Sequence, residues 1–215
     1  SWNSSSDLFN EIGGFAMSEE RYLTFALGKG RLANKTLELL EKIGITCEEI
    51  KDKDYVLATS LGGFTRGASA VEMASAYATI ENDGVYREPT CIKKIVDSAE
   101  NIVYMSNQEG TKIYTETAAR MMTEVLQSTV TDGISWVAAI DGMPSAGKTG
   151  TTNDNKDGWF VGYTRYYTTS VWVGYDLPKK LSDLKGNTYP GRIWKSFMEE
   201  VHEGLPVKDF KSAVQ

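Results

Sequence analysis

Hydrophobic positions recur at helical spacing in four stretches of the chain. They are Leu32 to Ile43, the stretch that follows the capping box Ser69-x-x-Glu72, residues 115–132, and residues 190–204. Local signals mark their ends: Gly44 follows the first stretch, Gly133 follows the third, and Pro190 opens the fourth. The pattern therefore predicts four amphipathic helices.

Two of these helices carry wide apolar faces. We expect the apolar residues of the helix over residues 115–132 to pack in a core, and those of the helix over residues 190–204 to lie across a sheet. The two sets are Ala118, Met121, Met122, Val125 and Leu126, and Ile193, Trp194, Phe197, Met198 and Val201.

Beyond Gly133 the pattern changes to short β-branched and aromatic stretches separated by turn-forming residues. We interpret four of them as successive antiparallel strands: 135–141, 147–152, 158–164 and 168–176. Two shorter strands flank residues 97–101 and predict a hairpin. The whole pattern predicts an α+β fold, mainly helical over residues 1–134, with antiparallel strands and a closing helix over residues 135–215.

Composition excludes several classes of function. The 215 residues carry a net charge of −6, and Lys and Arg are scattered, so we expect no nucleic-acid partner. One histidine and two cysteines without metal-ligand spacing predict no metal site, and no motif predicts an organic cofactor. No apolar run approaches the ~20 residues of a membrane-spanning helix.

The segment Gly142 to Thr152, GMPSAGKTGTT, fits two catalytic patterns that exclude each other. Gly142 to Thr149 matches a phosphate-binding loop, and Asp176 could serve as its magnesium ligand. Such a loop must lead into a helix, whereas the residues after Lys148 are poor helix formers. From Lys148 onward the same segment is K-T-G-T, a pattern of serine acyl-transferases that react with penicillin.

The K-T-G-T pattern requires an extended strand beside a pocket. Lys148 would place a positive charge next to a substrate carboxylate. Thr149 and Thr151 would share one face of the strand, and Gly150 would leave the backbone open to substrate. The Thr151 N–H would form half of an oxyanion hole.

The flanks of this motif carry a resemblance. SAGKTGTTNDNKDGWFVGYT and TTSVWVGYD closely resemble the C-terminal part of the transpeptidase domain of class A, bifunctional penicillin-binding proteins. SLGGFTRGASAVEMASAYATIENDGVY and IWKSFMEEV extend the resemblance over most of residues 55–210. It implies a β-lactamase-like fold, a five-stranded antiparallel sheet flanked by helices, of which this chain is a partial domain without the N-terminal portion. We expect the exposed sheet edge to favour self-association.

Members of this family carry S-x-x-K, S-x-N and K-T-G motifs in that order. By resemblance, Lys148 belongs to the third motif and Ser1-Trp2-Asn3 is the second: Ser1 would relay a proton and Asn3 would bind the substrate peptide. The S-x-x-K strings at Ser145 and Ser182 do not fit a helical turn, so we expect the nucleophile and its base to be missing.

The resemblance implies a peptidoglycan DD-transpeptidase, which takes D-Ala-D-Ala stem peptides and is acylated by β-lactams, without a cofactor. The parent protein would be membrane-anchored at the extracytoplasmic face of the bacterial cytoplasmic membrane. The alternatives are a β-lactamase or penicillin sensor, a non-catalytic wall-binding module, and a nucleotide-binding protein.

Overall fold

The computed structural model describes residues 31–45 and 67–213, so the predicted motif Ser1-Trp2-Asn3 lies outside the described residues. The chain divides into two compact units. The first contains helix α2 (Arg31–Lys42), which confirms the first predicted helix. The second contains residues 43–45 and everything described from Ser69 onward, and it carries the candidate site.

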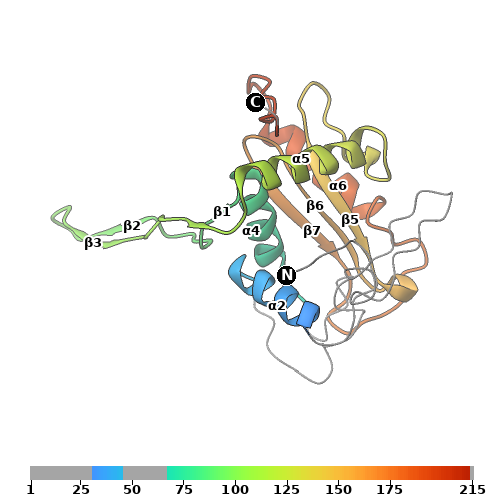
Figure 1. The fold of residues 1–215 in the computed structure, drawn as a ribbon, viewed down its shortest axis with the longest axis horizontal. Helices are drawn as coiled ribbons and strands as arrows, with labels where there is room; N and C mark the ends of the chain where they lie inside the picture. The colour runs from blue at the N-terminus through green and yellow to red at the C-terminus, as the bar shows by residue number, and fades with distance from the viewer. Residues whose placement is uncertain (1–30, 46–66, 214–215) are drawn as a thin grey trace, which may run out of the picture. The chain divides into compact units, whose positions relative to one another are not determined.

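A three-stranded antiparallel sheet forms the centre of the second unit (Figure 1). Its strands are β5 (Ala146–Thr151), β6 (Gly158–Tyr163) and β7 (Thr168–Val173), in that spatial order. Helices α4 (Ala70–Glu81) and α5 (Glu116–Thr131) lie on one face, and α6 (Tyr189–Val201) lies on the other. This arrangement confirms the α+β class and three of the four predicted strands.

The alternation of side chains along β6 explains why helices cover both faces of the sheet. Phe160 is fully buried against Trp194 of α6, with ring centroids 5.1 Å apart. Tyr163, on the opposite face, is buried beside Leu126 of α5 and hydrogen-bonds Thr123 at 2.9 Å. Two cores therefore hold the sheet, one on each side.

The shorter elements complete this unit. The capping box predicted at Ser69 is present, with both of its hydrogen bonds. The predicted hairpin is also present. The remaining elements are β1 (Val85–Tyr86), β2 (Lys94–Val96), β3 (Ile102–Met105), β4 (Thr111–Lys112), η2 (Trp136–Ala138) and η3 (Asn153–Asn155).

The strand predicted over residues 135–141 is wrong. Trp136–Ala138 form a single 3-10 turn, and only Ile140 makes a β-bridge, to Met143. The turn closes because Ala138 N–H donates to the Ser135 carbonyl at 2.9 Å. This local hydrogen bond replaces the strand ladder that the β-branched and aromatic composition suggested.

The buried face predicted for α5 is also wrong. Met121, Met122 and Val125 are each about half exposed, and of the five apolar residues expected in the core only Leu126 is buried. The buried stripe is Ala119, Thr123, Leu126 and Val130. A threonine fits it because its hydroxyl donates to the Ala119 carbonyl and also bonds Tyr163.

In α6, Trp194 and Met198 are fully buried, but Ile193 and Phe197 are about half exposed, so the predicted wide face is narrower than expected. No helix among residues 31–45 and 67–213 has the length and apolar character needed to cross a membrane.

Candidate active site

The K-T-G-T segment is extended. Lys148 to Thr151 are the last four of the six residues of β5, which pairs with β6 in a regular antiparallel register from Ala146 opposite Tyr163 to Thr151 opposite Gly158. A phosphate-binding loop would instead curl into the first turn of a helix here. The geometry excludes that alternative and confirms the extended backbone that the acyl-transferase pattern requires.

Strand alternation divides the motif between the two faces of the sheet. Lys148 lies opposite Val161, on the face that carries α5. Thr149 lies opposite Phe160, on the face that carries α6, and Thr151 shares that face. The lysine side chain and the two threonine side chains therefore leave β5 toward opposite faces, and the Lys148 ammonium group reaches Thr149 only by bending back to the strand.

Lys148 places a positive charge beside the backbone of β5. Its Nζ donates to the Thr149 carbonyl at 2.9 Å and lies 3.4 Å from Thr149 Oγ1, and it pairs with no carboxylate of the described residues. The side chain still contacts solvent, but burial by the surrounding protein lowers its pKa from the usual lysine value. A carboxylate or a developing oxyanion would complete this half of the site.

The two threonines rest against a turn that follows β7. Thr151 Oγ1 accepts a hydrogen bond from the Gly186 N–H at 3.0 Å. A Cβ on Gly186 would stand 2.5 Å from the Trp159 carbonyl oxygen and 2.7 Å from Thr149 Cβ, so only glycine fits this close approach. Gly186 was missed by sequence reasoning because nothing in the local pattern reveals a long-range backbone contact.

A compact turn fixes the end of β5. Thr152 N–H donates to the Asp157 carbonyl at 3.1 Å, and Asp157 N–H donates back to Thr152 Oγ1 at 2.8 Å. The Asp157 carboxylate also accepts from Trp172 Nε1 of β7 at 3.1 Å. The turn between these two residues contains Asp154 and Asn155 in the left-handed region, and asparagine and aspartate tolerate it well. The run of turn-forming residues was a usable signal for this turn, although the role of Asp157 was missed.

Neither S-x-x-K string forms a helical turn. Ser145 is buried just before β5, and its partner Lys148 is already in the strand. Ser182 and Lys185 lie in the irregular segment before α6. Neither pair has the one-turn spacing that would bring a serine and its base together on a helix face.

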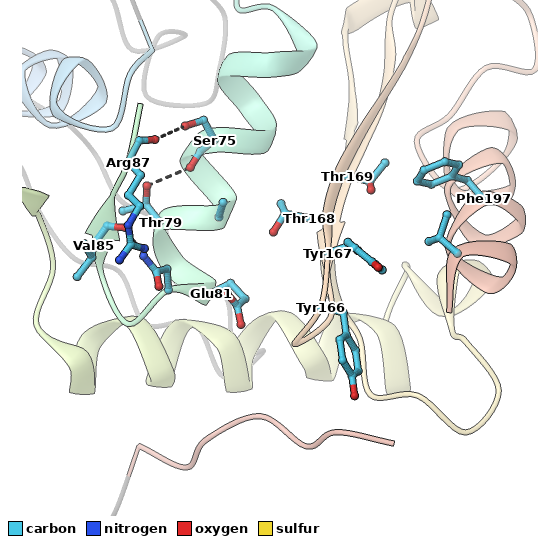
Figure 2. A pocket seen from close by; sticks show the side chains of 13 residues that line it. Ser75, Thr79, Glu81, Val85, Arg87, Tyr166, Tyr167, Thr168, Thr169 and Phe197 are labelled. Carbon is cyan, nitrogen blue, oxygen red and sulfur yellow. Dashed lines mark hydrogen bonds between the residues drawn. The ribbon is translucent and has the colours of Figure 1, made fainter. Parts of the chain in front are cut away.

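The pocket in Figure 2 lies away from the K-T-G-T motif, at the β7 edge of the sheet. It measures about 740 Å³, and its walls come from α4, the segment around β1, the β6–β7 turn, β7 itself and α6. The side chains in view include Ser75 and Thr79 of α4, Thr168 and Thr169 of β7, and Phe197 of α6. Because β5 and β7 are the two opposite edges of this sheet, the pocket and the motif are separate features.

An antiparallel sheet with helices on both faces and an extended K-T-G at its edge defines a class, the penicillin-reactive serine acyl-transferases. The family described as the penicillin-binding protein transpeptidase domain matches residues 44–199. The chain belongs to this family.

Similar proteins support this family assignment. Penicillin-binding protein 1A of Clostridium acetobutylicum is 38% identical over 170 residues, which cover 79% of this chain and 20% of that protein. Penicillin-binding protein 4 of Bacillus subtilis is 35% identical over 154 residues, which cover 72% of this chain and 25% of that protein. The chain thus spans a quarter or less of the length of these two relatives.

Solved structures show the same fold. The penicillin-binding protein PonA1 from Mycobacterium tuberculosis superposes with a TM-score of 0.68 at 27% identity, over 80% of this chain and 50% of that one. The same protein has also been solved in complex with penicillin V, with the same TM-score and coverage. These matches confirm the penicillin-binding transpeptidase fold.

Proposed function

We propose that this chain is the C-terminal part of the transpeptidase domain of a peptidoglycan DD-transpeptidase, which crosslinks stem peptides ending in D-Ala-D-Ala. The observation that carries the proposal is the edge strand β5, which presents Lys148 without a carboxylate partner among the described residues. The terminal carboxylate of a stem peptide, or that of a β-lactam, supplies the missing negative charge.

In this proposal the donor peptide lies antiparallel along the outer edge of β5, in the manner of an added strand. Gly150 adds no side chain to that edge, and the Thr151 N–H donates to the acyl oxygen. Thr149 contacts the substrate carboxylate, while the Thr151 hydroxyl, bonded to Gly186, holds the strand in position. Ser1 relays a proton to the leaving amine and Asn3 holds the peptide.

The attacking serine and its base come from a part of the parent protein outside these 215 residues, because neither S-x-x-K string forms a helical turn. In the reaction, the serine oxygen bonds to the donor carbonyl carbon, and D-Ala leaves with the relayed proton. An amine of a neighbouring peptidoglycan strand then attacks the same carbon and releases the serine. Since peptidoglycan lies outside the cytoplasmic membrane, we place the parent there, anchored to that membrane.

The outer edge of β7 pairs with no other strand of the described residues. We propose that the N-terminal part of the same domain adds strands at this edge, which would extend the three described strands toward the five that the family fold implies. The pocket supports this proposal, since it leaves the side of β7 open between α4 and α6.

A β-lactam labelling experiment tests the assignment of the nucleophile. Intact-mass spectrometry of the 215-residue chain after prolonged exposure to penicillin is expected to show no covalent adduct, because neither S-x-x-K string brings its serine and lysine together on a helix face. The longer parent protein, treated in parallel, is expected to gain the mass of one β-lactam. An adduct on Ser145 or Ser182 would contradict the assignment, and an unlabelled parent would contradict the proposed function itself.

A further inference from the structure

The hairpin formed by β2 and β3 projects away from the sheet and its helices (Figure 1). Every residue of both strands is exposed. Cross-strand pairs place Ile95 beside Tyr104 and Val96 beside Ile102, with a bulge that shifts the register at Val103. Apolar side chains therefore face solvent on both sides of the ribbon.

The two edges of this ribbon differ in charge. The β2 edge carries Lys93 and Lys94, and lysines on an edge strand discourage pairing with another strand. The β3 edge carries no charged residue, and its four residues Ile102, Val103, Tyr104 and Met105 are 55%, 67%, 45% and 57% exposed. The described part of the chain places no strand against it. The β3 edge is thus the unprotected one.

We infer that β3 pairs antiparallel with β3 of a second copy of this chain, so that the two hairpins form one four-stranded sheet. A two-stranded ribbon is marginally stable in water, and sheets become independently stable with three or more strands. The inference concerns a surface separate from the candidate active site and does not depend on the proposed function.

Self-pairing through β3 fits the charges and the geometry. An uncharged strand meets its own copy without like-charge repulsion, whereas pairing of β2 with β2 would bring Lys94 near its counterpart. Antiparallel pairing also points the two hairpins in opposite directions. Because each hairpin projects from its own sheet and helices, the central sheets of the two copies then lie at opposite ends of the new sheet.

Two other arrangements fit less well. A lipid surface would meet the hairpin tip first, and that tip carries Asp97 and Glu100, which anionic headgroups repel. Self-association through β7 would require the edge of a second sheet to enter the pocket between the α4 and α6 side chains that line it.

Sedimentation velocity across a concentration series of the 215-residue chain tests the inference. We expect a reversible dimer, and Tyr104→Lys should raise the dimer dissociation constant at least about tenfold, because it places like charges across the new strand pair. Ile95→Lys is the matched control: the residue is equally exposed, at 45%, and lies directly across the hairpin on the protected strand. We expect this control to leave the dissociation constant within about twofold.

Hydrogen exchange provides a second readout that needs no variant. Amides of residues 102–105 should become more protected as protein concentration rises, while those of β7 should not change. A chain that stays monomeric at high concentration would overturn the inference. So would equal effects of the two lysine substitutions, protection confined to β7, or binding to anionic vesicles that Tyr104→Lys abolishes.

Discussion

Lys148 is the residue that makes the proposed substrate recognition specific. Among the described residues its ammonium group hydrogen-bonds Thr149 and pairs with no carboxylate, so a substrate carboxylate can approach without displacing an ion pair there. Burial lowers its pKa, which means that the unbound site loses its charge at a lower pH than an ordinary lysine would. The affinity for a carboxylate ligand should follow that charge.

We therefore expect binding of a D-Ala-D-Ala peptide, measured by calorimetry, to be strongest while Lys148 is protonated and to weaken as the pH rises through its lowered pKa. Lys148→Gln should weaken binding by about 2 kcal/mol, or ~30-fold, and should remove the pH dependence over that range. Lys195→Gln is the control, because Lys195 lies on α6 and pairs with Glu199. Unchanged binding in Lys148→Gln would refute the role assigned to this lysine.

At the scale of elements, β5 keeps its position through contacts that lie far apart in the sequence. A Cβ added at Gly186 would meet Thr149 and Gly150 of β5 and the Trp159 carbonyl of β6. The Gly186 N–H donates to Thr151 Oγ1. The turn that contains Gly186 is thus a support for the motif strand, on the face opposite Lys148.

Gly186→Ala should displace this support. The added methyl group would stand 2.5 Å from a backbone oxygen, so the turn or the strand must move, at a cost of about 1–3 kcal/mol in unfolding free energy. Chemical denaturation measures the loss, and peptide affinity should fall with it. Lys185→Ala, at the exposed neighbouring position, should leave both quantities nearly unchanged. Wild-type stability and affinity in Gly186→Ala would show that the turn does not support β5.

Elements with strong local signals were predictable from the sequence, and elements decided by long-range packing were not. The capping box at Ser69 and Pro190 in the first turn of α6 marked two helix starts. Turn-forming residues separated β5 from β6 for the same reason: their backbone preferences are local. The buried face of α5 includes Thr123 instead, whose hydroxyl shares a hydrogen bond with Tyr163, a partner 40 positions away.

The candidate site follows the same division. The K-T-G-T strand was predictable because the functional side chains of the motif alternate with the two-residue period of a strand, and the structure confirms it as β5. The supports from Gly186 and Asp157 were not predictable, because each acts across strands that only the fold brings together. Ser1 and Asn3 remain predictions, since they lie outside the described residues.

At the scale of the whole molecule, the central sheet of the second unit has two edges, β5 and β7, that no strand of the described residues pairs with, and their chemistry differs. The β5 edge presents a cation and an open backbone, as expected for a peptide substrate. The β7 edge opens into the pocket between α4 and α6, as expected for further strands of the same domain. We therefore expect the chain to contribute substrate recognition and the rest of its parent to contribute the nucleophile.

Amide NMR of the isotopically labelled chain, titrated with a short peptide ending in D-Ala-D-Ala, tests this division most directly. We predict that the largest shift changes fall on Lys148 to Thr151 and their β6 neighbours, and that the same peptide with an amidated C-terminus causes much smaller changes. Shift changes confined to the residues that line the pocket at β7, or equal responses to the two peptides, would contradict the claim that β5 binds the substrate carboxylate.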